Sequence, residues 1–99
     1  MVQINWTLQS KEDLKKIADY IAKDSEKYAK LQVFRIINKT QILKEHMYIG
    51  RIVQEINNNV IRELIEGRYR IIYKIVSKSQ IDILTIYHTS RDLRKLKIT

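Results

Sequence analysis

The segment from Arg68 to Val76 alternates apolar and polar side chains along most of its length, and this alternation limits the possible folds more than any other feature. A period of two is typical of a β-strand with one buried face. A short polar turn follows, and a β-branched run then extends from Gln80 to His88. The two runs predict an antiparallel hairpin. We expect its first strand to place Tyr69, Ile71, Tyr73 and Ile75 on an apolar face, and Arg68, Arg70 and Lys74 on a cationic outer face.

Two amphipathic helices are predicted before this hairpin. In the first, Ser10 followed by Asp13 resembles a capping box, and apolar residues then recur at helical spacing. Asp24 or Ser25 can cap the second helix. Because the connection between the helices is short, we expect them to be antiparallel neighbours. The apolar stripe of the second helix consists of Ala29, Val33, Ile36, Ile37, Thr40, Leu43 and Met47.

Short extended segments complete the pattern. Residues 2–6 alternate as a strand does, and residues 51–56 and 60–65 flank a turn of three asparagines, 57–59, which tolerate a left-handed backbone. The order is strand, helix, helix and then successive strands. This order predicts a single α+β domain spanning residues 1–99. In it, an antiparallel helical hairpin packs on one face of a three- to five-stranded, mainly antiparallel sheet, whose other face is uncovered and basic.

Composition restricts the function classes. The 99 residues carry 19 Lys and Arg against 11 Asp and Glu, a net charge of +8, which favours an acidic or polyanionic partner or, equally, a solubilising surface. The chain has no cysteine for thiolate chemistry and no apolar run that could span a bilayer, so we expect a cytoplasmic protein without a membrane partner. His46 and His88 are far apart in sequence, and we assign neither a metal site nor a cofactor.

Four segments resemble the RelE/ParE superfamily of bacterial toxins, the toxic halves of type II toxin–antitoxin modules. They are G-R-I-V-Q-E (50–55), I-R-E-L-I (61–65), Y-R-I-I-Y (69–73) and I-L-T-I-Y-H-T-S-R (83–91). The resemblance is closer to the ParE-like branch. It implies growth inhibition, a role of the kind described as plasmid stabilisation, and a cognate antitoxin as partner. ParE-like members inhibit DNA gyrase without a chemical step of their own, whereas RelE-like members cut messenger RNA on the ribosome.

Metal-independent RNA cleavage requires a base, cations at the phosphoryl oxygens and an acid. Glu55 or His88 is the candidate base, Arg70 with Arg91 the candidate phosphate clamp, and His88 or Tyr87 the candidate acid. The resemblance implies a catalytic set of this kind, with Glu55, Arg70 and His88 at similar positions. However, a RelE-type site has a cluster of lysines on the strand before the turn, and residues 51–56 contain none.

Other interpretations of the same residues remain open. Arg70 can form a cross-strand ion pair with Glu63 or Glu66, and His88 can serve only as a hydrogen-bonding residue at a strand end. A plain nucleic-acid-binding module is less favoured, because the basic face lacks stacking aromatics other than Tyr87. We therefore expect a gyrase inhibitor, which is not an enzyme, with a ribosome-dependent mRNA endonuclease as the alternative. The expected target-binding residues are Arg68, Arg70, Lys74, Arg91, Arg94, Lys95 and Lys97.

Overall fold

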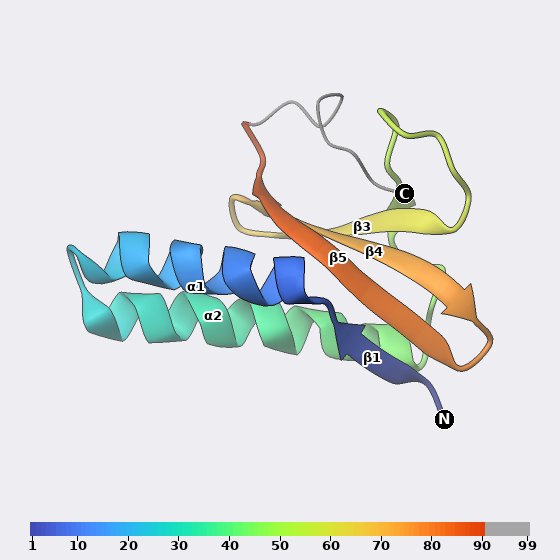
Figure 1. Cartoon of the computed structure of the whole chain (residues 1–99), viewed down its shortest axis with the longest axis horizontal. Helices are drawn as coiled ribbons and strands as arrows, with labels where there is room; N and C mark the ends of the chain where they lie inside the picture. The colour runs from blue at the N-terminus through green and yellow to red at the C-terminus, as the bar shows by residue number, and fades with distance from the viewer. Residues whose placement is uncertain (91–99) are drawn as a thin grey trace.

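In the computed structural model, which describes residues 1–90, two helices pack against one face of a five-stranded sheet (Figure 1). This is the predicted α+β architecture. In chain order the elements are β1 (Gln3–Trp6), α1 (Leu8–Ala22), α2 (Glu26–Lys39), the 3₁₀ helix η1 (Thr40–Lys44), β2 (Arg51–Ile52), β3 (Ile61–Glu66), β4 (Tyr69–Ser77) and β5 (Gln80–His88).

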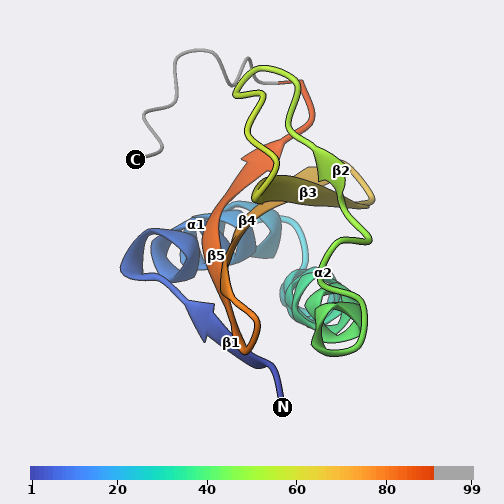
Figure 2. The same ribbon diagram turned by 90° about the vertical axis from the view of Figure 1, so that its right-hand side faces the viewer.

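The sheet has the order β1-β5-β4-β3-β2 and is mainly antiparallel, as predicted (Figures 1 and 2). Only the β1–β5 pair is parallel, and it places the N-terminal strand at one edge of the sheet, beside β5. The predicted β4–β5 hairpin is confirmed. Its register places Tyr69 opposite His88 and Arg70 opposite Tyr87. Because successive residues of a strand point to opposite faces, this register decides which side chains share a face.

The first helix begins three residues earlier than the sequence pattern suggested. Thr7 is its cap: the Thr7 hydroxyl oxygen accepts a hydrogen bond from the Ser10 backbone N–H at 3.2 Å and donates to the Ile83 carbonyl at 2.7 Å. The prediction of a start at Ser10 and Asp13 was therefore wrong. Asp13 instead accepts a hydrogen bond from the Ile86 backbone N–H at 3.0 Å, which joins α1 to β5. Ser25 caps α2, as predicted, by accepting from the Tyr28 N–H.

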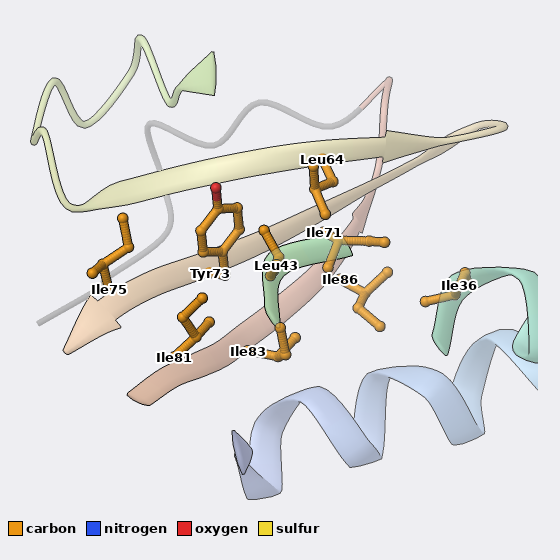
Figure 3. Packing of buried hydrophobic residues seen from close by; sticks show 9 residues of the cluster. All are labelled: Ile36, Leu43, Leu64, Ile71, Tyr73, Ile75, Ile81, Ile83 and Ile86. Carbon is orange, nitrogen blue, oxygen red and sulfur yellow. The ribbon is translucent and has the colours of Figure 1, made fainter. Parts of the chain in front are cut away.

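The main core lies between the helices and the sheet (Figure 3). Tyr73 is fully buried there, and its hydroxyl group donates to the Met47 carbonyl at 2.8 Å and accepts from the Gly50 N–H at 3.0 Å. A Cβ atom at Gly50 would lie 2.5 Å from the Tyr73 hydroxyl oxygen, so this close approach requires glycine. The predicted apolar face of β4 is confirmed. The buried residues of the cluster are Ile36, Leu43, Leu64, Ile71, Tyr73, Ile75, Ile81, Ile83 and Ile86.

The opposite face of the sheet is not the open basic surface that the sequence suggested. Val53, Ile61 and Ile72 form a second buried cluster there, because the chain after β2 folds back over it. The strand predicted at residues 51–56 is only two residues long. At Val53 the chain turns: the carbonyl of Val53 accepts hydrogen bonds from the N–H groups of Ile56 and Asn57. Asn57 has φ 53°, the left-handed conformation predicted for the asparagine turn.

Candidate active site on the second face of the sheet

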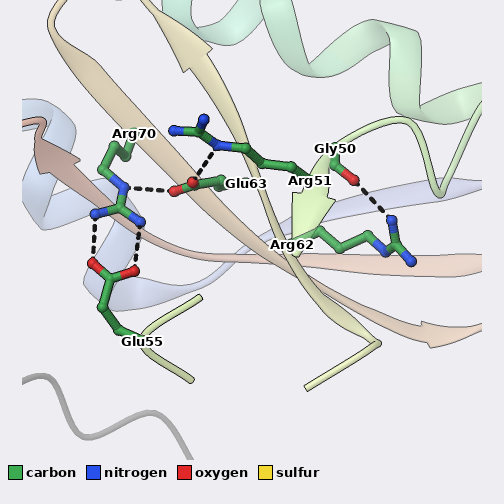
Figure 4. A network of polar contacts seen from close by, with 6 residues as sticks. All are labelled: Gly50, Arg51, Glu55, Arg62, Glu63 and Arg70. Carbon is green, nitrogen blue, oxygen red and sulfur yellow. Dashed lines mark hydrogen bonds and ion pairs between the residues drawn. The ribbon is translucent and has the colours of Figure 1, made fainter. Parts of the chain in front are cut away.

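Arg70 occupies the centre of a polar network on this second face (Figure 4). Its Nε donates to Glu63 Oε1 at 2.5 Å, and its two terminal nitrogens donate to the Glu55 carboxylate at 2.9 and 3.1 Å. The guanidinium is buried. The predicted ion pair between Arg70 and Glu63 is therefore confirmed, whereas the expectation that Arg70 faces solvent was wrong. A strand that alternates in polarity defines two faces, but it does not show which of them the rest of the chain covers.

Glu63 links Arg70 to a second arginine. The Glu63 side chain is only 3% exposed, and its Oε2 accepts from Arg51 Nε at 2.7 Å. Arg51 lies opposite Glu63 in the β2–β3 ladder and is 69% exposed. Two carboxylates thus neutralise two guanidiniums. A buried carboxylate requires such partners, because removing a charge from water without compensation costs several kcal/mol.

These contacts fix the charge of Arg70. Its hydrogen bonds to Glu55 raise the pKa of the Arg70 guanidinium above the usual value, and Glu63 acts in the same direction. The burial of Arg70 lowers the pKa but does not outweigh the two carboxylates. Arg70 is therefore a cation at every physiological pH, and its positive charge is already matched within the protein. A phosphate group could bind Arg70 only by competing with Glu55 or Glu63.

A hollow of about 320 Å³ opens beside this network. Its lining includes Glu55 and Arg70, two of the four candidate catalytic residues. Gln54 and Thr89 also line it, from the turn after β2 and from the end of β5. Hydrogen-bonding side chains thus surround a space that is open to solvent. Its chemistry is that of a polar cleft with matched charges.

His88 lies on the other side of the sheet. Its ring packs edge-on against Tyr69, with the ring centroids 5.7 Å apart, and Tyr69 packs against the main core. The Ser90 backbone N–H donates to His88 Nδ1 at 3.2 Å, so the neutral ring carries its hydrogen on Nε2. His88 lines a small hollow of about 160 Å³ together with Asp13 and Lys16 of α1. The structure therefore brings Glu55 and Arg70 together but separates them from His88.

Tyr87 shares a face with Arg70, since the two residues are opposite each other in the β4–β5 ladder. Its side chain packs against the second buried cluster and is half-buried.

The comparisons with known proteins agree with the fold. Residues 4–93 match the family of the ParE toxin of the type II toxin–antitoxin system, parDE. The chain belongs to this family. The chromosomal ParDE toxin–antitoxin system from P. aeruginosa has a similar structure, with a TM-score of 0.75 and 22% identity, over 91% of this chain and 98% of that one. At this identity the likeness shows the fold. No curated protein is similar enough to count as a match.

In this ParE-family toxin the three expected target-binding residues that lie within residues 1–90, Arg68, Arg70 and Lys74, do not form one cationic surface. Arg68 is exposed in the β3–β4 turn, next to Gly67 with its left-handed φ of 59°. Lys74 is half-buried and lies opposite Asp82 in the ladder, and Arg70 is buried in its ion pairs. The remaining predicted residues, Arg91, Arg94, Lys95 and Lys97, lie outside the described residues. The cationic strand face expected on β4 is thus interrupted by matched charges.

Three residues of the toxin's polar network, Arg51, Arg62 and Glu63, were not predicted as site residues. Glu63 falls between Ile61 and Ile65 on β3, and a carboxylate at this position of an apolar run was the available signal. Arg62, on the same strand, donates to the carbonyls of Tyr48 and Gly50 at 3.1 and 2.9 Å, and its guanidinium lies 5.0 Å from the Tyr48 ring centre. It fixes the loop from which β2 and Arg51 begin.

Residues 1–90 hold no cluster of three or more His, Cys, Asp or Glu side chains that is suited to a metal ion. Within the same residues, neither helix has the length and apolar character needed to cross a membrane.

Proposed function

We propose that this ParE-family toxin arrests growth by inhibiting DNA gyrase, without a chemical step of its own, and that a cognate antitoxin neutralises it. Membership of the ParE family supports the target. The observation that carries the proposal is the state of Arg70, whose guanidinium is held by two carboxylates. A bacterial gyrase is an enzyme of the cytoplasm, so the proposal also assigns the toxin to that compartment.

A cleavage mechanism would need Arg70 to stabilise charge on a phosphate. Breaking a buried ion pair by removing one partner costs about 3–5 kcal/mol, and the cost is smaller where a partner is partly in water. The Glu55 side chain is 23% exposed and is the partner that can be displaced more easily. Even then, Glu63 would still hold the Nε edge of Arg70. His88 would also have to act from the opposite face of the sheet, which disfavours a joint action of these residues on one phosphate.

The test uses the purified full-length toxin with gyrase, plasmid DNA and ATP. We expect loss of supercoiling and accumulation of gyrase-linked broken DNA. A parallel reaction with a ribosomal translation extract should show no new mRNA ends. Codon-positioned mRNA cuts with unchanged gyrase activity would overturn the proposal.

The target-contacting residues are tested by charge-matched substitution. The triple variant Arg94→Gln, Lys95→Gln and Lys97→Gln should weaken gyrase inhibition at least tenfold, because it removes three cations from the proposed contact region. The control triple variant, Lys11→Gln, Lys15→Gln and Lys27→Gln, removes the same charge from exposed helix positions and should inhibit almost as well as the wild type. Equal losses in both variants would mean that only the overall charge of the toxin matters.

The outer side of the helix pair is the surface that we assign to the antitoxin. A groove of about 620 Å³ runs along α1 and α2 and is lined mainly by apolar side chains, among them Val33, Phe34 and Ile37. Phe34 is exposed, and the charged residues Asp19, Glu26 and Lys30 line the same groove. The apolar lining suits the apolar face of an amphipathic helix, and the net charge of +8 of the whole chain favours an antitoxin that is acidic outside this contact.

Calorimetric titration with the antitoxin encoded beside the toxin gene tests this assignment. Phe34→Glu should weaken binding at least tenfold, because it places a carboxylate in the apolar groove. Val76→Glu introduces the same charge at an exposed apolar residue on β4 and should bind as the wild type does. If both variants bind equally, the antitoxin docks elsewhere.

One observation favours the alternative, a ribosome-dependent mRNA endonuclease. Glu55 and Arg70 line the same open hollow, so a base and a cation are side by side. This alternative predicts mRNA cleavage that disappears in His88→Ala while gyrase activity is untouched. Growth arrest that persists in His88→Ala together with gyrase inhibition would exclude it.

A further inference from the structure

A second large hollow, of about 620 Å³, lies between the tip of the helix pair and the β3–β4 turn. Figure 1 shows this turn above the helices, on the side where α1 connects to α2. Three tyrosines line the hollow: Tyr20 from α1, Tyr28 from α2 and Tyr69 from β4. They are far apart in sequence, and only the packing of the helices on the sheet gathers them. None of them belongs to the Arg70 network.

Two of these rings are largely in water. Tyr20 is 71% exposed and Tyr28 is 56% exposed, although aromatic side chains contribute most when they are covered. Rings that stay open around a hollow can offer their faces to a planar ligand. The size of the hollow falls within the range of about 300–1,000 Å³ typical of small-ligand pockets.

Several polar side chains that line the hollow have no hydrogen-bond or ion-pair partner among residues 1–90. Arg35 and Arg68 both line it and are exposed, and neither guanidinium makes a hydrogen bond or ion pair with another of residues 1–90. Gln32 also lines it, and the side-chain nitrogen of Gln32 is buried without an acceptor in the described part of the chain. Because this nitrogen is itself buried, the two exposed guanidiniums are the donors that a ligand in the hollow can reach.

We propose that this hollow binds unpaired nucleotides of a single-stranded nucleic acid. Bases stack on Tyr20 and Tyr28, because any base has a π-face that an aromatic ring can cover. The Arg35 and Arg68 guanidiniums contact the phosphates.

Two carboxylates in the lining fit this arrangement. Asp24 and Glu66 border the hollow, and carboxylates accept hydrogen bonds from the amino groups of bases. The same carboxylates repel phosphates, so the backbone of the strand lies along the arginines while a base enters the hollow. A duplex does not fit this description, since its bases are already stacked and paired. The ligand is therefore an unpaired segment.

The inference goes beyond the proposed function, since it requires neither gyrase nor the ribosome. The basic face expected on the sheet lacks stacking aromatics other than Tyr87, whereas the hollow at the end of the helix pair holds tyrosines and arginines together.

Fluorescence anisotropy with the full-length toxin tests the site, with labelled short oligodeoxycytidylate and oligocytidylate as probes, because cytosine carries the amino group that Asp24 or Glu66 would accept from. Tyr20→Ala and Tyr28→Ala should each weaken binding by at least about fivefold, because loss of one base–aromatic stack costs at least ~1 kcal/mol. Tyr20→Phe keeps the ring and should bind within about twofold of the wild type. All these variants keep the net charge, so general attraction to a basic protein is the same in each.

Tyr48→Ala is the matched control. Tyr48 is 55% exposed and also lies beside an arginine, but it is outside this hollow. It should bind both probes as the wild type does. Absence of binding by the wild type, unchanged binding in both tyrosine variants, or an equal loss in Tyr48→Ala would overturn the proposal. Tighter binding of one probe assigns the site to DNA or to RNA. A failure of the gyrase assay with this binding intact would refute only the proposed target.

Discussion

Ile71 and Ile72 are neighbours on β4, and both are fully buried, yet they lie on opposite faces of the sheet and in different surroundings. Ile71 belongs to the large cluster that α1 and α2 cover. Ile72 belongs to a cluster with only Val53 and Ile61 as its other buried members, next to the ion pairs of Arg70. The first face is closed by two helices, and the second by a turn-rich segment of the chain.

The two faces of the sheet serve different purposes because different kinds of chain segment cover them. Helices bury a broad apolar surface and stabilise the sheet, and loops that carry polar side chains form clefts that ligands can reach. The second face therefore holds the polar network and its hollow, while the first face supplies the stability that this network requires.

The largest effect should come from truncating the two isoleucines. Removing a buried Ile side chain to Ala costs about 2–5 kcal/mol, and the cost depends on how far the site can relax. We expect the cost of Ile71→Ala to lie near the upper end of this range, because the substitution leaves a cavity between elements that are packed on all sides. Ile72→Ala should fall near the lower end, since the segment above it can move inward. Urea unfolding measures both, and an equal or larger loss in Ile72→Ala would contradict the comparison.

The ion pairs of the second face should give the next largest effect. Arg70→Met leaves the buried Glu63 carboxylate in its ion pair with the exposed Arg51, and we expect a loss of about 3 kcal/mol, the low end of the range for a broken buried pair. The double variant Arg70→Met with Glu63→Leu removes both charges and should recover most of this loss. The free energy of unfolding in urea distinguishes the two. A double variant as unstable as Arg70→Met would mean that the pair contributes more than the neutralisation of a buried charge.

The hairpin and the helix pair could be predicted from the sequence because both depend on local periodicity. Tyr69, Ile71, Tyr73 and Ile75 alternate at every second position, and a strand converts this spacing into one face. The same alternation could not show that Arg70 is buried. Its burial depends on residues 53–60, which fold over β4 from elsewhere in the chain and make no periodic pattern themselves.

The candidate site was predicted only in part, because the contacts between its residues also depend on how distant segments pair. Arg70 and Glu55 were both named, and they are in contact. His88 was grouped with them because the family resemblance implied a set of Glu, Arg and His, but the register places Tyr87 with Arg70 and His88 with Tyr69. A register is set by pairing along the whole hairpin and includes irregularities after Ile72 and Ile75. A pattern of residue types does not contain that information.

A smaller effect is expected from the hydroxyl group of Tyr73 on the first face. Tyr73→Phe removes the acceptor of the Gly50 N–H and the donor to the Met47 carbonyl, and should cost about 1–3 kcal/mol because buried groups are left unpaired. Urea unfolding at neutral pH measures this loss. A loss below the error of the measurement would mean that water replaces the hydroxyl group at Gly50.

The same residue predicts a dependence on alkaline pH. Burial raises the pKa of Tyr73 above its ordinary value of 10.0, so the folded state holds this proton more tightly than the unfolded state. The resulting stability is fully present below pH 10 and is lost as the pH rises from there through the folded pKa. The wild type should therefore lose more stability than Tyr73→Phe between neutral pH and pH values above 10. Parallel slopes for the two proteins would contradict this cause.

The smallest effect should come from Arg51, and it tests how the second face divides its charges. Arg51 and Arg70 both contact Glu63, but Arg51 is 69% exposed, and exposed ion pairs contribute roughly 0–1 kcal/mol. Arg51→Gln should therefore cost less than about 1 kcal/mol in urea unfolding, and less still at high salt. If it costs as much as Arg70→Met, then Glu63 needs both cations equally. The stability of the Glu63 carboxylate would then depend on how many cations contact it and less on whether those cations are buried. The polar network would act as one unit that includes the exposed edge of the sheet.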